Sequence, residues 1–103
     1  MSVLLEFSIS PSDKGESMSP YVARSLDIVD KSGLPYQVTA MGTILEGEWD
    51  NVFEVVKKCF EDLKRDCHRV SITMKADYRA DKANCLVGKV KSVEKKLGRE
   101  LHH

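Results

Sequence analysis

The stretch Met41-Gly42-Thr43-Ile44-Leu45-Glu46-Gly47-Glu48 decides the fold, because it follows a short strand-like run and precedes the longest amphipathic helix pattern in the chain. It is typical of the return arm of a β-hairpin, since Gly42 suits the positive φ of a tight turn and β-branched or apolar residues follow it. Side chains alternate between the two faces of a strand, so Leu45 falls on one face, and Ile44 and Glu46 on the other. The stretch therefore predicts a strand with one face for the core and a carboxylate on the opposite face.

On the N-terminal side of this stretch, alternation predicts a first strand whose apolar face consists of Val3, Leu5, Phe7 and Ile9. Ser19 and Pro20 are a typical helix N-cap and first-turn pair, and apolar residues at helical spacing follow them. A first helix is therefore expected over about 20–31. A second strand is expected over 36–40, with Val38 as its core residue.

On the C-terminal side, a second helix is predicted by an apolar stripe formed by Trp49, Val52, Phe53, Val56, Phe60 and Leu63. The cleanest alternation in the chain then predicts a fourth strand, with its apolar face formed by Val70, Ile72, Met74, Ala76 and Tyr78. A 4-3-4 spacing predicts a third helix over 86–97, with a narrow seam formed by Leu86, Val90, Val93 and Leu97. A seam this narrow suits a partner helix as well as the helix's own sheet.

The order β-α-β-β-α-β-α predicts an α+β fold, a ferredoxin-like sandwich with two helices on one face of an antiparallel four-stranded sheet and an added C-terminal helix. The usual strand order of that fold is 4-1-3-2. Residues from three strands, all polar except Ile44, then share the face away from the helices: Glu6, Ser8, Ser10, Ile44, Glu46, Thr73, Lys75 and Asp77. We expect one domain over residues 1–101, with 102–103 the remnant of a purification tag.

Composition excludes several classes of protein. Sixteen Lys plus Arg balance sixteen Asp plus Glu in 103 residues, so no net field draws the chain toward nucleic acid or an anionic membrane. Three cysteines without a CxxC pair fit reduced thiols, and no apolar run approaches the ~20 residues needed to cross a bilayer. We expect a cytoplasmic protein that uses no metal and no cofactor. Because a chain this short would leave a sheet face open, we also expect a homo-oligomer.

Several segments together resemble the small, YkoF-like thiamine-binding protein family. They are Pro11, Ser19–Ala23, Ser32–Tyr36, Met41–Gly47, Arg69-Val70 and Lys75–Lys82, which cover nearly the whole chain in order. Met-Gly-Thr-x-x-Glu-Gly and Lys-x-Asp-x-Arg are the most specific of these. The resemblance implies a ferredoxin-like fold assembled into dimers and tetramers, and binding of thiamine or its hydroxymethylpyrimidine moiety without turnover. The loop beginning Pro11-Ser12-Asp13 departs from the family's Pro-hydrophobic-Gly form, so ligand contacts are not carried over to it.

Thiamine joins a cationic thiazolium to a flat aminopyrimidine, so its site needs a carboxylate, polar groups for the ring edge and an apolar or aromatic wall. The candidate binding residues are Glu6, Ser8, Tyr36, Met41, Gly42, Thr43, Ile44, Glu46, Lys75 and Asp77. The three carboxylates would supply charge, with Lys75 or a cation among them to relieve their mutual repulsion. The hydroxyls of Ser8 and Thr43 would supply hydrogen bonds. Ile44, Met41 or Tyr36 would form the wall.

Two other functions stay open beside this leading hypothesis of a non-enzymatic binder. The first is a structural or regulatory homo-oligomer whose open sheet face is used for subunit packing, in which Lys75 and Asp77 form cross-strand or inter-subunit ion pairs. The second is a hydrolase or transferase with Glu46 and Asp77 as an acid/base pair, although no nucleophile motif, metal cluster or phosphate loop accompanies them.

Overall fold

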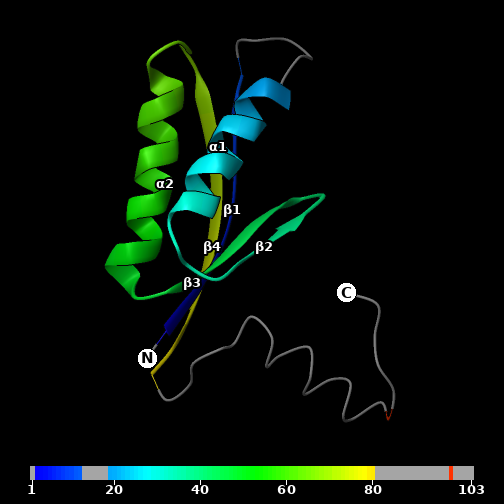
Figure 1. Ribbon diagram of the computed structural model, residues 1–103, viewed down its shortest axis with the longest axis vertical. Coiled ribbons are helices and arrows are strands. Elements are labelled where there is room, and N and C mark those ends of the chain that lie inside the picture. The colour runs from blue at the N-terminus through cyan, green and yellow to red at the C-terminus, as the bar shows by residue number, and fades with distance from the viewer. Residues whose placement is uncertain (1, 13–18, 81–97, 99–103) are drawn as a thin grey trace.

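Two helices cover one face of a four-stranded antiparallel sheet in the computed structural model, which describes residues 2–12, 19–80 and Gly98 (Figure 1). The elements are β1 (Ser2–Pro11), α1 (Ser19–Lys31), β2 (Tyr36–Thr39), β3 (Gly42–Gly47), α2 (Trp49–Lys64) and β4 (Val70–Arg79). This order and layering confirm the predicted ferredoxin-like α+β fold. The predicted third helix over 86–97 and the predicted domain end at residue 101 lie outside the described residues.

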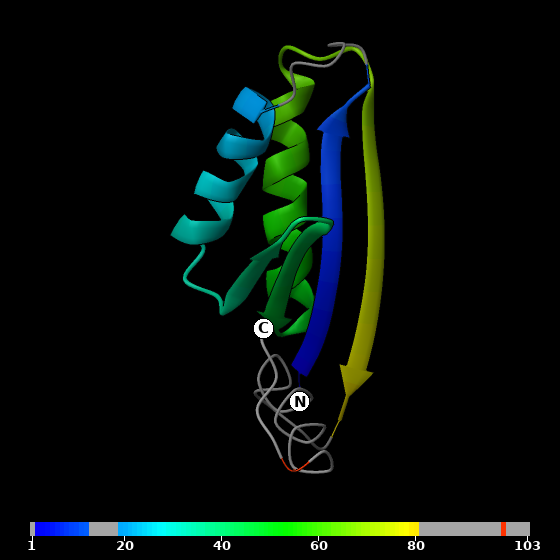
Figure 2. The ribbon, with the colours of Figure 1, turned by 90° about the vertical axis from the view of Figure 1, so that its right-hand side faces the viewer.

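The strands follow the predicted order, β2-β3-β1-β4, so β1 lies between β3 and β4. Its pairing with β4 is long, running from Ser2↔Arg79 to Pro11↔Val70. Its pairing with β3 is shorter and ends at Phe7↔Thr43. Figure 2 shows the consequence: the β2–β3 hairpin reaches only part of the way along β1, while β1 and β4 continue together past the hairpin tip.

The core lies between the sheet and the helices, and β1 contributes its whole predicted apolar face. Val3, Leu5, Phe7 and Ile9 are all buried, as is Leu45 of β3. Full burial of one such side chain stabilises the fold by roughly 1.5–3 kcal/mol. The buried stripe of α2 consists of Val52, Val55, Val56, Cys59 and Leu63. These elements enclose a continuous apolar layer.

Five residues that the sequence placed on core-facing surfaces are exposed, and Ala76 of β4 is one of them. Trp49 is 56% exposed, because the buried stripe of α2 runs through Val55 and Cys59 and does not include it. Its ring stacks on that of Phe53, with the ring centroids 4.4 Å apart. Val38, Met74 and Tyr78 are 50%, 47% and 54% exposed. They lie on β2 and β4, the two edge strands, where the helices give less cover than they give β1. The core prediction was wrong for these residues.

The hairpin turn is closed by Thr39, and Gly42 has a different role from the predicted one. The described glycines with positive φ are Gly33 and Gly98, so Gly42 does not take the left-handed conformation. The Thr39 hydroxyl instead accepts hydrogen bonds from the backbone N–H groups of Met41 and Gly42, at 3.2 and 3.1 Å. Gly42 is needed for close approach, since a Cβ there would lie 2.8 Å from the Phe7 carbonyl oxygen.

Candidate functional site

Two hollows flank β1 where the hairpin ends. The first, the helix-side cavity, has a volume of about 300 Å³ and lies between β1, the inner face of α1 and the residues 38–43 of the hairpin. The second, the open-face hollow, has about 280 Å³ and is lined by Glu6, Phe7, Ser8, Met41, Thr73, Met74 and Lys75. Phe7, Ser8 and Met41 line both. The two hollows therefore meet at the hairpin tip, where β3 stops covering β1.

The helix-side cavity has apolar walls and, among the residues that line it, no charged side chain. Its walls include Phe7, Leu26, Val29 and Val38, and Ser25 of α1 also borders it. Ser25 is 4% exposed, and its Oγ has no hydrogen-bond partner in the described part of the chain. An unpartnered buried hydroxyl costs free energy, so Ser25 lowers the stability of the packing between α1 and its neighbours.

The open-face hollow carries opposite charges on neighbouring strands. Glu6 of β1 lies opposite Lys75 of β4 in the strand register, and both side chains are exposed. Neither forms an ion pair with another described residue. Met41 at the hairpin tip is 84% exposed, so its thioether is accessible at the rim that the two hollows share. The hollow thus combines a carboxylate, an ammonium group and an apolar rim.

Six of the ten candidate residues line one hollow or the other. Ser8, Met41, Gly42 and Thr43 line the helix-side cavity, and Glu6, Ser8, Met41 and Lys75 line the open-face hollow. The other four line neither. Ile44 and Asp77 lie on the open face, opposite Glu6 and Leu4 in the register. Tyr36 is held away from both hollows, because its hydroxyl donates a hydrogen bond to Asp30 Oδ1 at 2.7 Å.

Glu46, the fourth of these residues, lies on the predicted face but is buried. It is 5% exposed, and the Ser2 hydroxyl donates a hydrogen bond to its Oε2 at 3.1 Å. Its backbone N–H donates to the Pro35 carbonyl at 3.0 Å. Alternation predicted the face of the sheet correctly, but it did not predict the burial, because burial depends on the elements packed around β3. The accessible carboxylate of the candidate site is Glu6.

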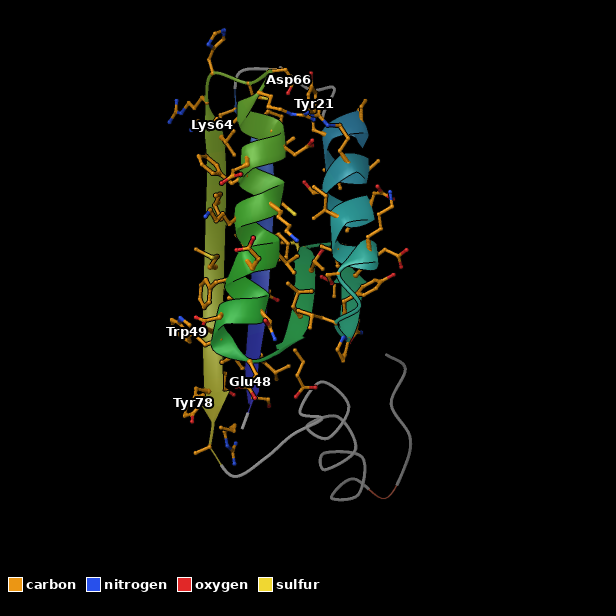
Figure 3. All side chains as sticks on the ribbon, turned by 60° about the vertical axis from the view of Figure 1, so that its left-hand side comes forward. Tyr21, Glu48, Trp49, Lys64, Asp66 and Tyr78 are labelled. Carbon is orange, nitrogen blue, oxygen red and sulfur yellow. The ribbon has the colours of Figure 1, made fainter. Side chains whose placement is uncertain are left out.

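Polar contacts between the helices hold Ser25 and its neighbours in place. The buried Cys59 thiol of α2 donates a hydrogen bond to the Ser25 carbonyl at 3.6 Å, and burial raises the pKa of this thiol to about 11, so it stays protonated. Arg24 pairs with Asp62 at 2.9 Å and with Asp66 at 2.8 Å. Figure 3 shows Asp66 and Tyr21 at this end of the helices. The hydrogen bond from Arg24 holds the pKa of Asp62 below its usual range.

Sequence reasoning missed Ser25, although the sequence contains a signal for it. Val22, Ser25, Leu26 and Val29 recur at i, i+3, i+4 and i+7, the spacing of the buried face of a helix. A serine within such an apolar stripe is a buried hydroxyl that needs a partner. The cavity itself has no such signal, because it depends on how far the hairpin reaches along β1.

Residues 5–94 match the sequence profile of the family described as thiamine-binding protein. UPF0045 protein MJ1052 of Methanocaldococcus jannaschii is 36% identical over 91 residues, which cover 88% of this chain and 91% of that protein. Its crystal structure superposes with a TM-score of 0.82 over 89% of this chain and 95% of that chain. UPF0045 protein Mb1933 of Mycobacterium bovis is 38% identical over 98 residues, 94% of this chain and 96% of that protein.

A solved domain of unknown function from Bacillus cereus is 31% identical, with a TM-score of 0.78 over 87% of this chain and 88% of that chain. The chain therefore belongs to the thiamine-binding protein family, which confirms the resemblance. Membership supports a role related to thiamine. Within the described residues, neither helix is long and apolar enough to span a membrane.

Proposed function

We propose that the chain is a non-enzymatic, cytoplasmic binding protein for thiamine or its hydroxymethylpyrimidine moiety. Family membership supports the general role. The observation that carries the finer proposal is the pair of hollows that meet at Phe7, Ser8 and Met41, one uncharged and the other bearing Glu6. Volumes of about 300 and 280 Å³ are at the low end of small-molecule sites, which suits a ligand of one or two rings.

The chemistry of thiamine matches the charges around the hairpin tip. Its thiazolium ring is a cation, and the Glu6 carboxylate is an exposed anion without an ion pair among the described residues. Lys75 on the neighbouring strand offsets part of this negative charge. Attraction of the thiazolium ring would therefore depend on its close contact with the Glu6 carboxylate and not on a long-range negative field. The exposed Met41 side chain offers a polarisable apolar contact for a ring.

The arrangement favours binding over acid/base catalysis by Glu46 and Asp77. Both residues face Leu4 in the register, one from β3 and the other from β4, so Leu4 lies between them. Strand spacing alone then separates their backbones by roughly 10 Å. Glu46 is also buried and bonded by Ser2, which restricts its access to a substrate.

Calorimetric titration with thiamine, its phosphates and hydroxymethylpyrimidine tests the proposal. The parent protein should bind thiamine or hydroxymethylpyrimidine and release it unchanged. Glu6→Gln should weaken thiamine binding by about tenfold, the lower end expected for losing a hydrogen bond to a charged group. Hydroxymethylpyrimidine lacks the thiazolium, so its affinity should change little. Glu54→Gln, an exposed residue of α2, is the matched control. A parent protein that binds none of these compounds would contradict the proposal.

A structural homo-oligomer, a dimer or tetramer, is the second candidate, and the β4 edge favours it. β4 is a ten-residue edge strand, and its Met74 and Tyr78 side chains are exposed. Trp49 at the start of α2 is exposed as well, and Figure 3 labels Trp49 and Tyr78. Long exposed edges and exposed apolar side chains are typical of surfaces that pair with another chain. Sedimentation velocity at micromolar concentration should show a dimer or tetramer. A monomer under those conditions would exclude this function without affecting the first proposal.

A further inference from the structure

The lower half of β4 exposes side chains on the face of the sheet that the helices cover. These residues lie directly opposite buried core residues of β1, in the pairs Tyr78↔Val3, Ala76↔Leu5 and Met74↔Phe7. Directly opposed residues of an antiparallel pair point to the same face, so the three side chains project into the helix layer. All three are nevertheless exposed. They form an apolar strip, the β4 strip, which the described helices leave largely open.

Trp49 extends this strip onto α2. Asp62 marks the flank of α2 that faces α1, because it pairs with Arg24 at 2.9 Å. Trp49 and Phe53, four residues apart with stacked rings, lie on the other flank of the buried stripe. Figure 3 shows the labelled Trp49 and Tyr78 on the side of the molecule away from α1. An exposed tryptophan beside an exposed apolar strip is typical of a surface that another segment covers.

The sequence supplies a segment of matching size. The seam of the predicted helix over 86–97, which lies outside the described residues, consists of Leu86, Val90, Val93 and Leu97. A helix of this length is marginal in water, so it needs a surface on which to bury its seam. At the rise of an α-helix the seam is ~17 Å long, and at the rise of a strand Met74 lies ~14 Å from Tyr78. The seam and the β4 strip are therefore of similar length.

The connection to this segment is long enough for it to return over its own sheet. β4 ends at Arg79, directly after Tyr78, at one end of the β4 strip. Residues 80–85 then connect the strand to the seam, and an extended connection of this length spans up to ~20 Å. The chain can therefore reverse direction after β4 and place the seam on the β4 strip.

We propose that residues 86–97 dock on the β4 strip of the same chain, with Leu86 beside Tyr78 and Val90 beside Ala76. The two spacings agree, because four residues of a helix advance ~6 Å and two residues of a strand ~7 Å. The docked segment covers Trp49 and the exposed face of β4. It leaves the backbone edge of β4 accessible, and its docking does not depend on ligand binding.

Fluorescence of Trp49 tests the docking directly, because Trp49 is the only tryptophan in the chain. Val90→Asp places a charge in the seam and should release the segment. Emission should then shift to longer wavelength, and acrylamide should quench it more readily than in the parent. Ser92→Asp, the same new charge two residues away and off the seam, is the matched control and should leave both properties at the parent values. Identical emission and quenching for the parent and Val90→Asp would overturn the proposal.

A cross-link tests which chain supplies the segment. Ala76→Cys with Val90→Cys, in a Cys85→Ser background, should be joined by a short bis-maleimide within one chain. The product should run as a monomer on a denaturing gel, with its mass raised by one linker. Cys59 and Cys67 are buried, which protects them from the reagent. Ala76→Cys with Ser92→Cys is the matched control and should form the link much more slowly.

The proposal requires both the change in Trp49 emission and the link within one chain. A link that joins two chains would overturn it, because the segment of a second copy would then occupy the β4 strip. Shielding of Trp49 that is lost on dilution of the parent would overturn it for the same reason. A cooperative urea transition shows whether Val90→Asp is folded, and if it is not, the cross-link alone decides. Equal rates of linking for the two cysteine pairs would also contradict the docking.

Discussion

The helices α1 and α2 cover the same face of one sheet, but they pack on it differently. α2 buries five residues, and Val52, Cys59 and Leu63 among them are fully buried. On the corresponding face of α1, Val29 is fully buried, Val22 is 39% exposed, and Ser25 has an unpartnered hydroxyl. The difference follows from the sheet beneath, because the hairpin ends before it fills the space under α1. One helix supplies packing energy, and the other borders a cavity.

Polar contacts replace part of the missing packing on α1. Arg24 forms hydrogen-bonded ion pairs with Asp62 and Asp66, and the Cys59 thiol donates to the Ser25 carbonyl. At the other end, Asp30 accepts a hydrogen bond from Tyr36. These contacts position α1 without filling the cavity, so its face toward the cavity stays accessible while its backbone is held.

The largest expected effect is in α2. Leu63→Ala should lower the free energy of unfolding by ~2–5 kcal/mol, because Leu63 is fully buried and its loss leaves a cavity. Leu26→Ala is the matched substitution on α1. Leu26→Ala should lower the free energy of unfolding by clearly less than Leu63→Ala, because Leu26 is half-buried and already borders a cavity. Urea unfolding of both variants measures the difference, and equal losses would contradict the unequal packing of the two helices.

A smaller effect is expected from the ion pairs that join the helices. Arg24→Ala should cost ~1 kcal/mol at pH 7, since the Arg24 side chain is 33% exposed and solvent screens such pairs. Its bond to Asp62 lowers the pKa of Asp62, and the carboxylates raise the pKa of Arg24, which stays charged throughout. The stabilisation by Asp62 is therefore fully present above its unfolded pKa, about 4, and is lost as the pH falls through its lowered folded pKa.

Unfolding of the parent and Arg24→Ala from pH 8 to pH 2 measures this dependence. The difference between them should be constant down to about pH 5 and should shrink below about pH 4. Lys31→Ala, which removes an exposed pair with Asp27 within α1, is the control for loss of a surface charge. A difference that stays constant down to pH 2 would show that Arg24 acts through packing of its stem rather than through its charge.

The smallest effect is expected at the mouth of the cavity. Val22→Ala should change the free energy of unfolding by no more than ~0.5 kcal/mol, because Val22 is 39% exposed. Val56→Ala, the same change on α2, should lower the free energy of unfolding by more than Val22→Ala does. Val56 is only 5% exposed, and each buried methyl group contributes about 0.8 kcal/mol. Thermal unfolding of the two valine variants compares them. An equal shift would mean that the two helices contribute alike.

Local pattern was sufficient to predict the six described helices and strands and the order of the strands in the sheet. Alternation in β1 identified a face that is wholly buried, and helical spacing with Ser19-Pro20 placed α1 within one residue of its observed start. Pattern failed at Trp49 and Tyr78, because an apolar residue at the correct spacing is buried only if another element covers it. The edges of the sheet lack that cover in the described structure.

The candidate site was predicted less completely than the fold, for a related reason. The residues at the hairpin tip and Glu6 were identified because their chemistry and their strand positions can be read locally. Ser25 was missed and Glu46 was expected on an open face, since both depend on how separate elements pack. Whether a hydroxyl has a partner, or a carboxylate is covered, is a property of the assembled layers.

The long pairing of β1 with β4 also constrains the order in which the chain can fold. β1 is an interior strand formed by residues 2–11, yet its longest partner is formed by residues 70–79. Closing so long a loop is slow compared with forming the helices or the β2–β3 hairpin. During synthesis, one edge of β1 must therefore stay without its strand partner until β4 has left the ribosome. Local elements can form early, but the sheet is complete only when β4 joins it.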